Sequence, residues 1–112
     1  MMIEDKEALA RYRDWSDEAV SLRLTAARFA AGYRQQKDFA TAVGLRATTS
    51  NTQEVKGRPE RSVIRYLYRN HGIDFNFVLH GDFLQLGGDV QERLFAALAE
   101  LAPSRGRTSS SD

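Results

Sequence analysis

Apolar residues recur at steps of three and four along most of the chain, which is the spacing of an amphipathic helix. No segment alternates apolar and polar residues over six positions, so strands are not expected. The pattern predicts helices at the following ranges: about 3–14, 17–31, 35–43, 60–70, 75–80 and 90–101. The sequence therefore predicts an all-α fold.

Polar residues that favour helix starts precede several of these ranges. Ser16 and Asp74 are expected N-caps, because a short side-chain oxygen can accept a hydrogen bond from a free amide of the first turn. The last predicted helix carries an apolar stripe whose members recur at helical spacing: Val90, Leu94, Leu98 and Leu101. The stripe fits two interpretations, packing on the same chain or packing on a second copy of it.

Residues 47–55 (ATTSNTQEV) break the pattern, because they are almost devoid of large apolar side chains. Ser, Thr, Asn and Gln compete with the backbone for hydrogen bonds, so propensity alone favours a polar surface loop here. The alternative is a helix that offers its polar side chains outward. Asn and Gln amides can hydrogen-bond base edges in the major groove of DNA, and Thr adds a hydroxyl and a methyl group.

Charge is unevenly distributed along this nearly neutral chain. Residues 33–70 hold eight Lys/Arg and three acids, a balance of +5, whereas residues 1–32 hold five and six, and residues 71–112 hold three and six. The balances of +5, −1 and −3 sum to the net charge of +1. A basic middle segment favours a localised surface that faces a polyanion.

Several classes of protein are not expected from the composition. No apolar run approaches the ~20 residues of a membrane-spanning helix, and the first residues lack the apolar stretch of a secretory signal. The chain has no cysteine, and its two histidines, His71 and His80, each precede a glycine at a predicted helix end. Gly87-Gly88 lies outside any phosphate-loop motif. We therefore expect a cytoplasmic protein that is not an enzyme and has no cofactor or metal.

The spacing around the polar window matches a family pattern. Gln36, Phe39, Ala40, Gly44 and Glu54 stand at the intervals of a Gln-x-x-apolar-Ala helix, its closing glycine and a later glutamate. A Gly/Pro turn follows at 57–59, and residues 72–81 (GIDFNFVLHG) match the closing signature. Residues 22–81 thus resemble the phage-repressor type of helix-turn-helix domain, the Cro/CI or XRE family. Where the family places an apolar anchor in the recognition helix, this chain has Ser50.

The resemblance implies a five-helix lambda-repressor-like helix-turn-helix domain at 16–82, with a polar N-terminal arm or helix at 1–15. A further amphipathic helix lies within 83–102, and 103–112 is expected to be a disordered tail. Arg28 and Glu54 would form a structural ion pair. The residues that would read bases are Arg46, Ala47, Thr48, Asn51 and Thr52, and those that would contact phosphate are Arg34, Gln36, Lys56 and Arg58.

The expected function is that of a sequence-specific regulator of transcription that binds double-stranded DNA, a dimeric repressor associated with the nucleoid when bound. One such domain covers a half-site, so a homodimer is expected. The stripe Val90, Leu94, Leu98 and Leu101 is the expected dimerisation element, or a surface for a protein partner. The alternative function is a helix-turn-helix interaction module, such as the antitoxin of a toxin-antitoxin pair.

Overall fold

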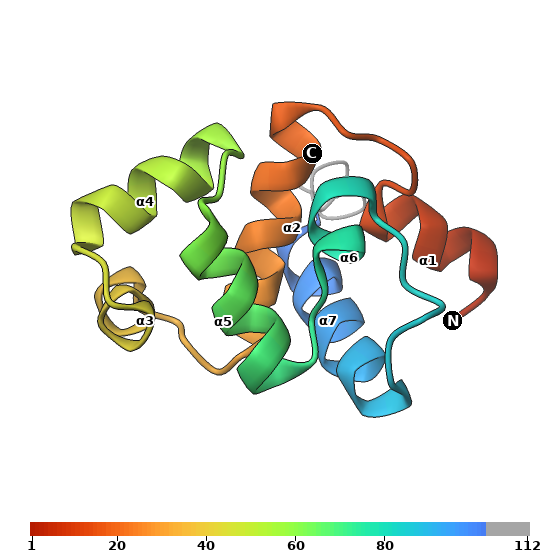
Figure 1. The fold of residues 1–112 in the computed structure, drawn as a ribbon. Coiled ribbons are helices and arrows are strands. Elements are labelled where there is room, and N and C mark those ends of the chain that lie inside the picture. Colours follow the sequence, from red (N-terminus) through yellow and green to blue (C-terminus); the bar gives the residue numbers. More distant parts are fainter. Residues whose placement is uncertain (103–112) are drawn as a thin grey trace, which may run out of the picture.

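The structure, a computed structural model, describes residues 1–102 (Figure 1). Within that range all regular structure is helical, which confirms the predicted fold class. The seven helices are α1 (Ile3–Ala10), α2 (Asp17–Ala30), α3 (Gln36–Val43), α4 (Ala47–Lys56), α5 (Arg61–His71), α6 (Phe75–His80) and α7 (Gly88–Leu101). The tail expected at 103–112 lies outside the described residues.

The predicted capping residues begin their helices as expected. The Ser16 hydroxyl accepts a hydrogen bond from the Ala19 amide at 3.2 Å, and the Asp74 carboxylate accepts one from the Phe77 amide at 3.0 Å. Each bond pairs one of the amides that an α-helix leaves free in its first turn. These two caps therefore fix the positions at which α2 and α6 begin.

α2 is the central helix, and three of the other six helices pack against it. α7 and α6 contact it on one side and α4 on another, while α1 lies on α7 (Figure 1). α3 and α4 form one end of the molecule and α1 lies at the opposite end. The buried apolar core combines side chains from both ends and the middle of the described chain, from Ala10 through Leu24 and Leu67 to Leu98, and α4 contributes none to it. The N-terminal and C-terminal helices are therefore built into the same core as the middle of the chain.

The apolar stripe of α7 requires a correction to the sequence-based expectation. Val90, Leu94 and Leu98 are buried in the chain's own core, where α7 packs on α2, and Leu101 is half-buried against the same cluster. Val90, Leu94 and Leu98 are covered intramolecularly, so the stripe is not free to serve as a dimerisation surface or a partner-binding surface. Of the two interpretations of this stripe, packing on the same chain is the one that the structure supports.

An arginine that the sequence analysis did not select fastens α1 to the rest of the fold. Arg23 of α2 is fully buried, with an exposed fraction of 0%. Its guanidinium donates to five backbone carbonyls, those of Ala10, Arg11, Asp14, Val78 and Leu79. Burial lowers the pKa of Arg23 to about 10. Because a buried charge is costly unless it is hydrogen-bonded, this arrangement couples the segment after α1 to the end of α6.

No helix within residues 1–102 is long and apolar enough to cross a membrane.

Candidate nucleic-acid interface

α4, the polar window of the sequence, is a regular helix of ten residues. The loop interpretation that propensity favoured is therefore wrong. Gly44 ends α3 with a φ of +95°, a conformation that glycine adopts without steric cost, and α4 begins three residues later. α3 and α4 are thus joined by a tight turn at one end of the molecule (Figure 1).

The inner side of α4 is held by an ion pair. Glu54 is 9% exposed, and its carboxylate accepts hydrogen bonds from Arg28 Nε at 2.9 Å and Arg28 Nη2 at 3.0 Å. The remaining terminal nitrogen of Arg28 donates to the carbonyls of Tyr33 and Arg34. The pair expected from the resemblance is therefore present. It is bidentate, a geometry that fixes orientation as well as distance.

The same carboxylate collects two further donors and so joins three helices. Thr25 Oγ1 of α2 donates to Glu54 at 2.8 Å, and Gln36 Nε2 of α3 donates at 3.0 Å. Ser50 Oγ of α4 in turn donates to Gln36 Oε1 at 2.6 Å. Within residues 1–102 no buried side-chain nitrogen or oxygen lacks a partner. A fully satisfied buried network of this kind favours one arrangement of α4 relative to α2 and α3.

Ser50 occupies the position where the resembled family has an apolar anchor. Its side chain is buried, with an exposed fraction of 3%, and its hydroxyl is bonded to Gln36. The anchor of this helix is thus a hydrogen bond rather than an apolar contact. The sequence shows the substitution at position 50 but not the partner of Ser50, and the resemblance predicts a phosphate contact for Gln36. In the structure the Gln36 amide oxygen accepts a hydrogen bond from Ser50 and its amide nitrogen donates one to Glu54, so both polar atoms are bonded within the protein.

A set of aromatic rings in edge-on and tilted contact positions α3 on α5. Tyr33 and Tyr66 share a hydrogen bond of 2.7 Å between their hydroxyls, and the Phe39 ring lies edge-on to both. Burial, reinforced by the bond to Tyr33, raises the pKa of Tyr66 to about 12. His71 completes the set with its ring 5.4 Å from that of Tyr66. Burial, with a smaller contribution from the charge of Arg93, lowers the pKa of His71.

The outer side of α4 is polar and exposed. Ser50 and Glu54 face inward, so residues about half a turn away face outward. All the residues that were expected to read bases are exposed: Arg46, Ala47, Thr48, Asn51 and Thr52. Val55 is also exposed, at 66%, and its position on this helix adds an apolar contact point that the sequence analysis missed. The sequence signal that would have found it is helical spacing, because Val55 follows Thr48 by seven residues and Thr52 by three.

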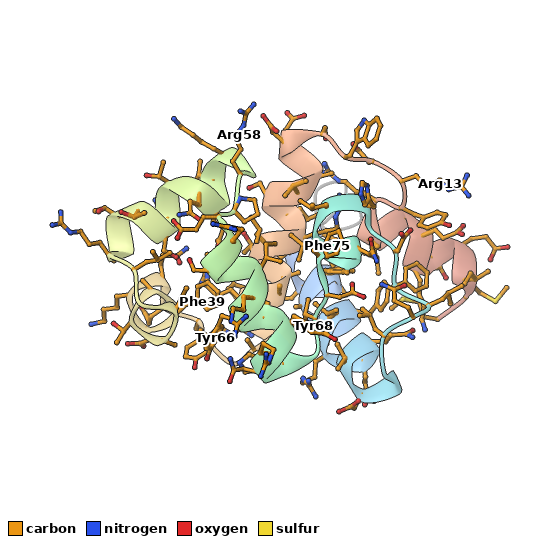
Figure 2. All side chains as sticks on the ribbon, viewed as in Figure 1. Arg13, Phe39, Arg58, Tyr66, Tyr68 and Phe75 are labelled. Atoms are coloured by element: carbon orange, nitrogen blue, oxygen red, sulfur yellow. The ribbon has the colours of Figure 1, made fainter. Side chains whose placement is uncertain are left out.

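The cations that were expected to contact phosphate are not equivalent. Lys56 is exposed at the end of α4. Arg58 is exposed but forms an ion pair of 3.0 Å with Asp17 (Figure 2). Arg34 is turned toward α7, where it forms a bidentate pair with Glu100 and lies over the Phe29 ring. The charge of Arg34 joins the loop before α3 to the end of α7, and, as for Arg58, a contact with phosphate requires that this exposed pair open or be shared. The phosphate role of Arg34 stays a prediction.

The turn after α4 approaches α2 closely. Gly57 has a φ of +67°, and a Cβ atom at this position would lie 2.1 Å from the backbone oxygen of Asp17. Only glycine fits there without a shift of the backbone. This contact fixes the end of α4 and the following Arg58 against the start of α2.

Residues 1–102 contain no group of three or more His, Asp or Glu side chains arranged to hold a metal ion. His80 lies beside the exposed Trp15 ring, away from α4. Comparisons with protein-family models, with curated proteins and with solved structures found no match to the chain.

Proposed function

We propose that the protein is a sequence-specific regulator of transcription that binds double-stranded DNA and acts in the cytoplasm on the nucleoid. In this proposal residues 16–82 form a helix-turn-helix domain of the phage-repressor type, and α4 is the recognition helix. The supporting observation is the two-sided character of α4. Its inner side is fixed by the Arg28–Glu54–Gln36–Ser50 network, and its outer side presents small polar side chains to solvent.

The chemistry of the outer side suits base recognition. Asn51 carries a donor and an acceptor that match an adenine edge, and the Thr methyl groups and Val55 suit the thymine methyl. A recognition helix must be held rigidly, because bidentate contacts to a base lose their value when the helix shifts. The buried network supplies that rigidity through hydrogen bonds to two other helices.

Cations around α4 supply the expected contacts to the strands. Arg46 precedes the helix, Lys56 ends it, and Lys37 is exposed in the first turn of α3. None of these three forms an ion pair among the residues that the structure describes. Arg58 joins them only when its pair with Asp17 opens or is shared. Such contacts give affinity that falls with salt and carries no sequence information.

A dimer remains part of the proposal, since one such domain would cover one half-site. The α7 stripe does not supply the contact between protomers, because it is covered by α2. A repressor of this kind would act by occupying its operator, with two copies of α4 in successive turns of the major groove.

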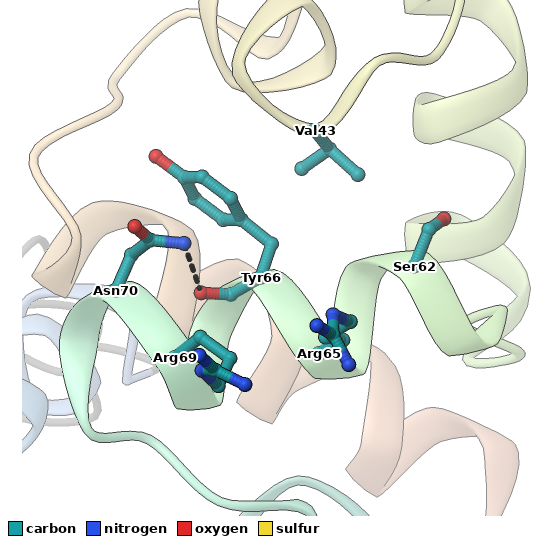
Figure 3. Close-up of a pocket in the computed structure, with 6 residues that line it drawn as sticks. All are labelled: Val43, Ser62, Arg65, Tyr66, Arg69 and Asn70. Carbon is teal, nitrogen blue, oxygen red and sulfur yellow. Dashed lines mark hydrogen bonds between the residues drawn. The ribbon is translucent and has the colours of Figure 1, made fainter.

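The test begins with selection of the preferred site from random duplexes, followed by fluorescence anisotropy over a range of salt. Asn51→Ala is expected to cost about 1–3 kcal/mol on the selected site and little on random DNA. Lys56→Ala is expected to weaken binding to the selected site and to random DNA equally. It should also reduce the slope of log affinity against log salt concentration by about one unit. Asn70→Ala and Arg13→Ala are the matched controls, because both side chains are exposed away from α4, Arg13 after α1 (Figure 2) and Asn70 near the end of α5 (Figure 3). Equal losses for Asn51→Ala and Asn70→Ala on the selected site would contradict the proposal.

A further inference from the structure

A groove between α5 and α6 leaves apolar side chains uncovered. It has a volume of about 710 Å³. Tyr68 of α5 and Phe75 of α6 line it and are 59% and 50% exposed, and Figure 2 shows them on the same side of the molecule. Ile64 and Leu79 are half-buried beside them and continue into the core. Four contiguous apolar side chains from two helices form a surface of the kind that proteins use to bind other proteins.

The groove is also strongly basic on one side. Arg61, Arg65 and Arg69 line it at steps of one helical turn along α5. Figure 3, a close-up of a separate pocket on the α3 side of α5 that Arg65 and Arg69 also line, shows these two side chains leaving the helix on one side and Tyr66 turning toward α3. In residues 1–102 no acid pairs with any of the three. Their charges are therefore available to a partner.

The one acid that lines the groove is already occupied. The Asp74 carboxylate accepts hydrogen bonds from the Phe77 amide and from Gln85 Nε2. It caps α6 and does not neutralise the arginines of α5. Three cations and one acid give the groove a net charge of +2 beside its apolar floor.

We propose that this groove is a docking site for an acidic amphipathic helix of another protein. A helix laid between α5 and α6 would place apolar residues at i, i+3, i+4 and i+7 on Tyr68 and Phe75. Its glutamates and aspartates would lie along Arg61, Arg65 and Arg69. The site does not depend on the proposed DNA contacts of α4, so it would give the protein a second, independent partner.

Charge decides against two other occupants. A second copy of this chain docked by its own groove would bring two surfaces of charge +2 together, which is unfavourable at an interface. A DNA strand would satisfy the arginines but leave the apolar floor of Tyr68 and Phe75 in water. Only a partner that is both acidic and apolar matches the two halves of the groove.

The test uses a fluorescein-labelled peptide of about 14 residues, four helical turns, with leucine at the i, i+3, i+4 and i+7 positions and glutamate elsewhere. A second peptide has lysine in place of each glutamate. Anisotropy is measured with the full-length protein at low salt. We expect the glutamate peptide to bind and the lysine peptide to bind about tenfold more weakly or not at all. The double variant Arg65→Glu/Arg69→Glu should reverse that preference.

Point variants then locate the site. Tyr68→Ala and Phe75→Ala should each weaken binding of the glutamate peptide about tenfold, because aromatic anchors contribute most of the binding energy at such interfaces. Leu84→Ala is the matched control, an apolar side chain that is 74% exposed outside the groove, and it should have no effect. In the unaltered protein, amide shifts induced by the peptide should cluster in 61–69 and 74–79. That measurement needs no variant to fold.

Five results would overturn the proposal. The first is equal binding of both peptides, and the second is equal loss in Tyr68→Ala and Leu84→Ala. The third is an amide-shift map centred outside α5 and α6. The fourth is concentration-dependent dimerisation in sedimentation that Tyr68→Ala abolishes, which would assign the groove to a second copy. Loss of duplex binding in Arg65→Glu/Arg69→Glu without any peptide binding would assign it to nucleic acid instead.

Discussion

The buried Arg28–Glu54 pair makes the stability of the α4 arrangement measurable. Glu54→Gln keeps the shape of the side chain but removes its charge, so Arg28 stays buried opposite a neutral amide. Breaking a buried pair in this way costs about 3–5 kcal/mol. A domain of this size has a stability of about 5–15 kcal/mol, so the loss is a large share of the total. At about 4 °C per kcal/mol, Tm should fall by about 12–20 °C.

The assay is thermal and urea unfolding followed by circular dichroism at 222 nm. Arg34→Ala is the control, since it breaks the Arg34–Glu100 pair, whose partners are both largely exposed. Exposed pairs contribute little, so this variant should leave Tm nearly unchanged. Arg28→Met/Glu54→Gln should lose less stability than the sum of the losses in Arg28→Met and Glu54→Gln, because the double variant keeps no buried charge without a partner, although it also loses the Arg28 bonds to the Tyr33 and Arg34 carbonyls.

Two results would refute this reasoning. Equal shifts of Tm for Glu54→Gln and Arg34→Ala would mean that burial does not decide the worth of an ion pair here. Additive losses in the Arg28→Met/Glu54→Gln cycle would mean that the two side chains do not act as a unit.

Three further predictions concern other parts of the fold. Gly57→Ala should destabilise the protein by several kcal/mol more than Gly44→Ala in urea unfolding, because both residues have positive φ but only Gly57 meets a backbone atom, the Asp17 oxygen at 2.1 Å. Ser50→Val should cost about 1–3 kcal/mol in the same assay, since it leaves the partly buried amide oxygen of Gln36 without its donor. The lowered pKa of His71 predicts stability that is fully present above its unfolded pKa of about 6.5 and is lost as the pH falls through the folded value, so Tm should drop between pH 7.5 and 5 and drop less in His71→Gln. A stabilising effect of Gly57→Ala or of Ser50→Val, or a Tm that rises as the pH falls, would contradict the contact on which that prediction is based.

The periodic segments were predictable because their signals are local. The apolar spacing of α2, α5 and α7 and the caps at Ser16 and Asp74 depend on residues within one or two turns. α4 was not predictable from propensity, because its helix is stabilised by partners far along the chain. Glu54 is bonded to residues 18, 26 and 29 positions earlier, and no local pattern contains those contacts. The family resemblance supplied the helix where propensity predicted a loop.

For two features of the fold, prediction from the sequence was incomplete: what covers the stripe of α7, and the role of Arg23. The stripe of α7 indicated that one face is apolar, but periodicity does not say what covers that face, and the cover is α2. Arg23 was overlooked although a signal was present. It stands between Val20 and Leu24 on the apolar side of α2, where a cation is out of place unless it has buried partners.

The partners of Arg23 have a consequence for how this molecule tolerates change. All five acceptors are main-chain oxygens, so these five hydrogen bonds of Arg23 do not depend on which side chains stand at those positions. Replacing Arg11 or Leu79 would leave every one of these bonds in place. Inserting or deleting a single residue between Ala10 and Asp14 would misalign several of them at once. Chain length in that short stretch is therefore under tighter constraint than its composition.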